Sequence, residues 1–97
     1  MPAYVIADVQ VADPARYEEY KRLAAASIAT YGGKYIARGG KSGKLEGEWT
    51  PNRLVILEFE SYQRAKQWYD SPEYRPAREL RRAIAGANLV FVDGMPG

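Results

Sequence analysis

The sequence contains neither cysteine nor histidine in its 97 residues. The absence of cysteine excludes disulfide bonds and thiolate nucleophiles, and the absence of both residue types excludes Cys/His zinc sites. Histidine-dependent catalytic triads and haem ligation through histidine are excluded as well. The sequence therefore predicts neither a metal site nor a bound cofactor, and its serines have no histidine to act as a base.

An excess of one charge sign and a long apolar run are also missing. Fourteen basic residues are matched by twelve acidic ones, for a net charge of +2, and the two signs are interleaved. Such a balance gives a weak field, which argues against a nucleic-acid partner. The apolar runs are shorter than a membrane span, and no charged-then-apolar leader precedes Tyr4. We therefore expect a single cytoplasmic domain over residues 1–97 with no membrane partner.

Strand and helix patterns alternate along the chain. Asp13 and Pro14 are typical of a helix start, Gly32-Gly33 of a helix end, and Ser61 of a second start. The predicted elements are a strand over 4–11, a helix over 14–31, strands over 34–38 and 53–60 joined by a polar loop with a strand-like stretch at 45–49, a helix from 62 to 86 interrupted at 70–72, and a strand over 89–92.

This order predicts an α+β, ferredoxin-like βαββαβ fold. Right-handed crossovers would place both helices on one face of a four-stranded antiparallel sheet. The other face is too apolar to meet water, so we expect a second copy to cover it, sheet against sheet. The residues predicted for that face are Tyr4, Ile6, Ile36, Leu54 and Ile56, with either Leu89 and Phe91 or Val90 and Val92.

The chain from Tyr4 to Val92 also resembles a small bacterial family of domains of unknown function in the dimeric α+β barrel superfamily. The residues that carry the resemblance are Tyr35, Arg38-Gly39-Gly40, Glu46-Gly47 with Trp49, Arg53, Glu58-Phe59, Trp68-Tyr69 and Ser71-Pro72-Glu73-Tyr74. The resemblance implies a face-to-face homodimer. The superfamily includes cofactor-independent monooxygenases, lactone isomerases, haem-dependent peroxidases and stress-response proteins, and the haem branch resembles this chain least.

Three charged residues are candidates for chemistry. Asp8, Arg38 and Glu58 have the same strand parity and fall on strands that we expect to be neighbours. An arginine between two carboxylates could bind a carboxylate or enolate, or tune a general base. The alternative, which we favour, is an ion-pair network at the subunit interface or at the wet end of the barrel, because structural ion pairs perturb pKa values as catalytic ones do.

Aromatic residues are candidates for a pocket that binds a small planar organic ligand. They are Tyr17, Tyr20, Trp49, Trp68 and Tyr74. The alternative for the helix residues is packing against the sheet, which their spacing favours. Trp49 lies in the hairpin and could instead reach over the partner subunit.

Arginines recur along the last predicted helix, at positions 75, 78, 81 and 82. Glu73 and Glu79 interrupt the row, so we expect a solvated helix face rather than an anion-binding surface.

Two functions remain open at this point. The first is a ligand-binding or accessory module with structural charges, which the lack of a readable nucleophile, metal set or phosphate cradle favours. The second is a cofactor-independent enzyme of monooxygenase or isomerase type, in which Arg38 holds an anionic oxygen and Glu58 or Asp8 moves the proton. A cavity between helices and sheet that reaches both Arg38 and Glu58 would favour the enzyme.

Overall fold

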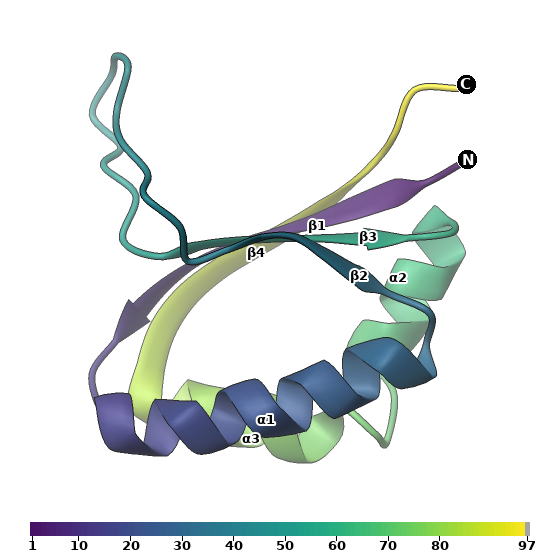
Figure 1. Ribbon diagram of the computed structural model, residues 1–97, viewed down its shortest axis with the longest axis horizontal. Helices are drawn as coiled ribbons and strands as arrows, with labels where there is room; N and C mark the ends of the chain where they lie inside the picture. Colours follow the sequence, from purple (N-terminus) through teal and green to yellow (C-terminus); the bar gives the residue numbers. More distant parts are fainter. Residues whose placement is uncertain (97) are drawn as a thin grey trace.

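A four-stranded antiparallel sheet with helices on one face forms the molecule. The computed structural model describes residues 1–96. Its elements are β1 (Ala3–Val11), α1 (Pro14–Thr30), β2 (Lys34–Arg38), β3 (Leu54–Phe59), α2 (Tyr62–Tyr69), α3 (Arg75–Ile84) and β4 (Ala85–Asp93). The strand order is β2-β3-β1-β4, and each neighbouring pair is antiparallel. Figure 1 shows the helices below the sheet and no helix above it. The predicted α+β, ferredoxin-like fold is confirmed.

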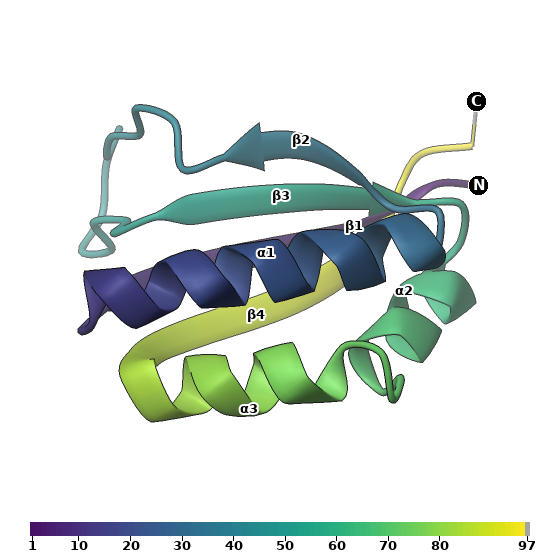
Figure 2. The ribbon, with the colours of Figure 1, turned by 60° about the horizontal axis from the view of Figure 1, so that its bottom comes forward.

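The first helix begins and ends where the local sequence signals place it. The Asp13 carboxylate accepts a hydrogen bond from the Arg16 N–H at 3.1 Å, and Pro14 is the first helical residue. Gly32 then adopts a φ of +73°, a left-handed conformation that glycine reaches without a Cβ penalty. These short-range interactions determine the length of α1, which packs against α3 beneath the sheet (Figure 2).

The second helical stretch is two helices joined by a tight turn around Ser71. The Ser71 hydroxyl donates to the Trp68 carbonyl at 2.7 Å and accepts from the Tyr74 N–H at 3.0 Å. This one side chain therefore provides hydrogen-bond partners for a backbone carbonyl at the end of α2 and for a backbone N–H in the turn that leads into α3. The predicted interruption at 70–72 is confirmed.

Trp68 is the centre of the packing between helices and sheet. It is 2% exposed, and its ring centroid lies 4.2 Å from that of Tyr74 and 5.3 Å from that of Phe59. Its Nε1–H donates to the Ser27 hydroxyl at 3.0 Å, so the one polar atom of the indole is satisfied inside the core.

The register of β4 decides which of its residues face the helices. Val90 lies opposite Ile6 and Val92 opposite Tyr4, on the uncovered side, where they are 60% and 49% exposed. Leu89 instead packs toward the helices. We call the uncovered side of the sheet the open face. Its apolar residues are Tyr4, Ile6, Leu54, Ile56, Val90 and Val92.

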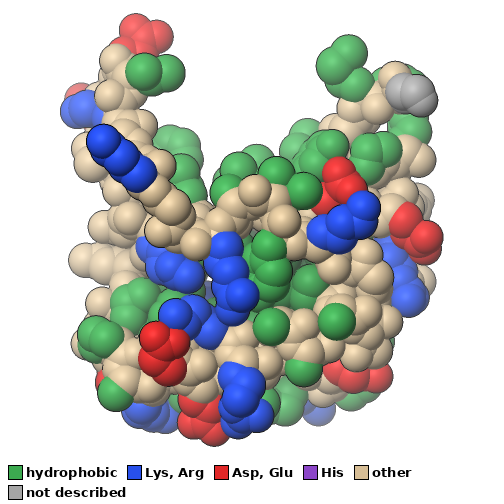
Figure 3. Space-filling model, in the orientation of Figure 1, with side chains coloured by type: hydrophobic (Ala, Val, Ile, Leu, Met, Phe, Trp, Pro, Cys, Tyr) green, Lys and Arg blue, Asp and Glu red, His purple; other side chains and the backbone are tan. Residues whose placement is uncertain are grey.

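The connection between β2 and β3 is a long loop, residues 39–53, rather than a tight hairpin. The predicted strand-like stretch at 45–49 is wrong, because these residues have no partner strand and Gly47 breaks the extended backbone with a φ of +93°. The loop rises on the side of the open face, and the chain termini rise at the other end of the sheet (Figure 1). Figure 3 shows hydrophobic side chains in the hollow between them.

Candidate functional site

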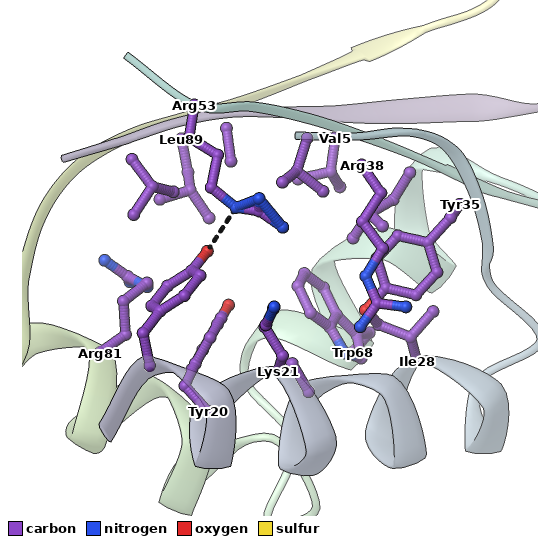
Figure 4. Close-up of a pocket in the computed structure, with 16 residues that line it drawn as sticks. Val5, Tyr20, Lys21, Ile28, Tyr35, Arg38, Arg53, Trp68, Arg81 and Leu89 are labelled. Carbon is purple, nitrogen blue, oxygen red and sulfur yellow. Dashed lines mark hydrogen bonds between the residues drawn. The ribbon is translucent and has the colours of Figure 1, made fainter. Parts of the chain in front are cut away.

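A small cavity lies between the helix-covered side of the sheet and α1. It encloses about 30 Å³, and apolar side chains of β1, β3 and β4 form its roof. Tyrosine and tryptophan rings and four basic side chains complete the lining: Tyr17, Tyr20, Tyr35, Trp68, Lys21, Arg38, Arg53 and Arg81. Figure 4 shows Arg53 directed into this space from the sheet and Lys21 from α1, with Arg81 at its edge. We call it the arginine cavity.

The tyrosines of the arginine cavity are neutral hydrogen-bonding groups. Tyr17 and Tyr20 stack with their ring centroids 5.2 Å apart. The Tyr20 hydroxyl lies 2.9 Å from that of Tyr74, which does not itself line the cavity. Burial raises the pKa of Tyr17, Tyr20 and Tyr35 above the ordinary value of a phenol. The phenols therefore stay protonated at neutral pH and can donate hydrogen bonds to a ligand.

Arg53 enters the arginine cavity from the residue that precedes β3. Its Nε–H donates a long hydrogen bond, 3.4 Å, to the Tyr17 hydroxyl, and its guanidinium carbon lies 5.4 Å from the Tyr17 ring centroid. Gly39 makes this placement possible. Its φ is +67°, and a Cβ at this position would collide with the Arg53 guanidinium. The glycine thus permits the left-handed backbone conformation and leaves room for the Arg53 side chain.

Arg38 reaches the same cavity because of a bulge in β2. The register shifts between Tyr35 and Ala37, so that Arg38 lies opposite Val55 on the helix-covered side. Its guanidinium carbon stacks 4.3 Å from the Tyr35 ring centroid (Figure 4). Arg38 itself is exposed, which places it at the mouth of the cavity.

Arg81 is the buried cation of the group. Only 5% of its surface is exposed, and its Nε has no hydrogen-bond partner among residues 1–96. Over the same residues, no carboxylate forms an ion pair with Arg38, Arg53 or Arg81. Lys21 pairs with Glu18 at 2.7 Å, but Glu18 does not line the cavity. The cavity is therefore a concentration of positive charge without an acidic counterpart.

The predicted gathering of Asp8, Arg38 and Glu58 is wrong. The β2 bulge turns Arg38 to the helix-covered side, while Asp8 and Glu58 stay on the open face. The two carboxylates are also apart, because Glu58 lies opposite Tyr4, four residues and about 13 Å along β1 from Asp8. The arginine cavity reaches Arg38 but not Glu58. One inserted residue thus reverses the parity on which the prediction depends.

Asp8 and Glu58 each have a partner on the open face. Trp49 Nε1–H and the Asn52 backbone N–H each donate to the Asp8 carboxylate at 2.8 Å. These hydrogen bonds, led by that of Trp49, lower the pKa of Asp8 against the opposing effect of burial. Glu58 forms an ion pair with Lys34 at 3.7 Å. Asp8 therefore ties the base of the 39–53 loop to β1 and is not directed at a ligand cavity.

The predicted aromatic group is divided between the two sides of the sheet. Tyr17, Tyr20 and Trp68 line the arginine cavity, and Tyr74 is hydrogen-bonded to Tyr20 outside it. Trp49 is 61% exposed and binds Asp8 on the opposite side. The structure thus brings together the helix aromatics and separates the hairpin tryptophan from them.

Two arginines of the cavity are not identified by the sequence reasoning. Arg81 is expected on a solvated helix face, but it lies four residues after Ala77 and three before Ile84, both of which are buried. Arg53 has the same strand parity as Val55 and Leu57, which face the helices. In both cases the spacing relative to buried residues indicates a position facing the core, whereas the charge of the residue predicts a position in solvent.

A second, larger cavity lies between α2 and the sheet at β4. It encloses about 220 Å³ and shares Val5, Trp68 and Leu89 with the arginine cavity as walls. Its one charged lining residue, Lys66, pairs with Asp70 at 3.0 Å. This space is apolar and lacks the converging polar groups that orient a ligand.

No other type of centre emerges from the part of the chain that the structure describes. Within residues 1–96, carboxylates do not gather in a group of three that could hold a metal ion. Over that range, no helix combines the length and apolarity needed to cross a membrane.

The chain is similar in fold to several solved structures. A protein of unknown function from Rhodopseudomonas palustris, RPA0582, is 21% identical with a TM-score of 0.76, over 99% of this chain and 84% of that one. SnoaB, a cofactor-independent oxygenase from Streptomyces nogalater, is 14% identical with a TM-score of 0.70, over 99% and 95%. A dimeric ferredoxin-like protein of unknown function from Bacteroides fragilis is 14% identical with a TM-score of 0.64, over 96% of each chain.

No curated protein sequence matches the chain. The family model of the domain of unknown function DUF1330 matches residues 2–95, which is nearly the whole sequence. The chain therefore belongs to the DUF1330 family, a family whose function is unknown.

Proposed function

We propose that this protein is a dimeric module that binds a small organic molecule in the arginine cavity. One observation carries the proposal: phenol, guanidinium and ammonium groups converge on a space whose remaining walls are apolar. Ligand sites typically have such a lining, in which apolar walls supply burial and a few polar groups fix orientation. The present volume of about 30 Å³ holds a polar head group, so the rest of a ligand would extend toward the mouth at Arg38.

The dimer is proposed to form through the open face. No helix covers this face, so its apolar residues are partly exposed to solvent, most of all Val90 and Val92. The Bacteroides fragilis protein of similar fold is described as dimeric, which supports a dimer here. A second copy would bury these residues and leave the arginine cavity accessible, because the cavity lies on the other side of the sheet.

Thermal denaturation in the presence of aromatic acids and quinones tests the binding function. A compound that binds only the folded chain raises its melting temperature by mass action. Arg38→Gln, at the cavity mouth, should reduce the increase, whereas Arg22→Gln, on the exposed side of α1, should leave it unchanged. The proposal is wrong if no compound raises the melting temperature, or if both variants respond like the parent chain.

A cofactor-independent enzyme is the second candidate. Arg38 and the neutral phenols could hold an anionic oxygen, and the fold is shared with the oxygenase SnoaB. Asp8 and Glu58 face away from the cavity, so proton transfer would have to involve a phenol or water. Oxygen consumption with hydroquinones, compared between the parent chain and Tyr20→Phe, tests this candidate. Absence of turnover would reject the enzyme candidate and leave the binding module as the remaining proposal.

A further inference from the structure

We infer that the ligand of the arginine cavity is an organic carboxylate, held by Arg81 and Arg53 with its apolar part directed toward the mouth. The inference rests on the proposed binding function and deepens it, because it names the chemical class that the cavity selects. Three observations support it independently: the unpartnered atom of Arg81, the absence of acidic lining, and the planar geometry of the available donors.

Arg81 is a buried cation with an unused donor. Its surface is 5% exposed, and its Nε–H finds no acceptor among residues 1–96. A buried N–H without an acceptor is costly, and native structures satisfy nearly all of them. The side chain is part of the cavity wall, so a ligand that enters the cavity can provide the missing acceptor.

The remaining charges of the cavity also call for an anion. Arg38 and Arg53 make no ion pair within the described chain, and no carboxylate lines the space. A neutral ligand would bury the guanidinium groups further without compensating their charge. An anion would instead relieve the repulsion among them, and the protonated Tyr17 hydroxyl could add a hydrogen bond.

The geometry favours a carboxylate among anions. A guanidinium presents its donors in a planar fork that matches the two oxygens of a carboxylate. The space of about 30 Å³ suits a head group of that size, and the rings of Tyr20 and Trp68 provide apolar contact for the organic part of the ligand. Figure 4 shows Arg53 and Lys21 directed toward each other across the centre of this space.

The test is a titration of the full chain, enriched in ¹⁵N, with sodium benzoate and with benzamide at constant ionic strength. The two probes have the same ring and nearly the same size, and they differ in charge. The arginine Nε–H signals of Arg81 and Arg53 report directly on the cavity. We expect benzoate to shift both signals saturably and benzamide to bind at least tenfold more weakly.

Substitutions separate the cavity from the surface. Arg81→Gln should weaken benzoate binding at least tenfold, whereas Arg82→Gln, exposed on the same helix, should leave it unchanged. If Arg81→Gln fails to fold, the half-buried Arg53→Gln provides the same comparison.

The outcomes distinguish this inference from the binding function on which it rests. Equal binding of benzoate and benzamide at the cavity signals overturns the preference for an anion and leaves a binding module. Benzoate binding that survives both Arg81→Gln and Arg53→Gln overturns the assignment of the site. If neither probe nor any screened compound perturbs the cavity signals, the inference and the proposed function both fail.

Discussion

The two sides of the sheet use similar residues for different purposes. On the helix-covered side, Val5 and Leu57 are 6% and 4% exposed, whereas Val90 on the open face is 60% exposed. The charges divide as well. Arg53 and Arg81 lie between the sheet and the helices without a carboxylate partner, and Asp8 and Glu58 lie on the open face with local partners. The helix-covered side therefore combines the core with a cationic cavity, while the open face carries the 39–53 loop and exposed apolar side chains.

The largest expected effect compares the two tryptophans. Trp68→Ala should destabilise the fold by about 3–5 kcal/mol, because it leaves a large space in the core and removes the hydrogen bond to Ser27. Trp49→Ala should cost only about 1 kcal/mol, since an exposed ring and one hydrogen bond to Asp8 are lost. Urea denaturation measures both. Equal losses would mean that the two sides of the sheet do not differ in packing as described.

The next effect concerns the open face alone. Val90→Lys places a charge on the open face, within the proposed dimer interface, and we expect the dissociation constant of the dimer to rise at least 100-fold, equivalent to about 3 kcal/mol. Light scattering at micromolar concentration should then detect a monomer, and circular dichroism should detect an unchanged fold. Gln10→Lys, near the end of β1 and already polar, is the matched control. A parent chain that is itself monomeric would contradict the assembly.

A smaller effect is expected on the cavity side at Gly39. Gly39→Ala should cost about 1–2 kcal/mol, because alanine is strained at a φ of +67° and its Cβ collides with the Arg53 guanidinium. Gly40→Ala meets nothing within 4 Å and should be neutral. Thermal denaturation compares the two variants, and the Arg53 Nε–H signal should move only in the first. Similar behaviour of both variants would mean that Gly39 does not determine the position of Arg53.

The smallest expected effect is the pH dependence of the folding stability that Asp8 contributes on the open face. Its pKa is lower in the folded chain than in the unfolded one, so the unfolded state binds the proton more readily. The stability contributed by Asp8 is therefore complete above its ordinary pKa of about 3.9 and is lost as the pH falls through the lowered value. Melting temperatures should fall less steeply on acidification for Asp8→Asn than for the parent chain. The exposed Glu60→Gln is the control, and parallel curves for all three would contradict the role of Asp8.

Much of the fold can be predicted from local signals. Asp13 and Ser61 begin helices where their side chains can accept a hydrogen bond from an N–H three residues on. The alternation of β1 and β3 identifies the buried side of each strand, as at Val5 and Phe59. Such signals are readable because they depend on neighbours within one turn of helix or one strand pair. The family-model match over residues 2–95 confirms the resemblance to a family of domains of unknown function.

The candidate site is less predictable, because it depends on register and on packing between distant segments. The bulge in β2 sends Arg38 to the covered side, and nothing at positions 35–37 announces the inserted residue. The charge of Arg81 predicts a place in water, although its spacing with Ala77 and Ile84 is that of a buried residue. The choice between Leu89 and Val90 for the open face likewise depends on the pairing of β4 with β1.

The sequence by itself determined the order of elements, the capped starts of α1 and α2, the two apolar sides of the sheet and the absence of histidine and cysteine chemistry. Periodicity and capping are short-range properties, so the residue pattern contains them. Only the tertiary structure decided that Arg38, Arg53 and Arg81 share one cavity and that Asp8 and Glu58 lie outside it. A one-residue change in strand register reverses the side that a residue faces, and the burial of a charge depends on every element packed around it.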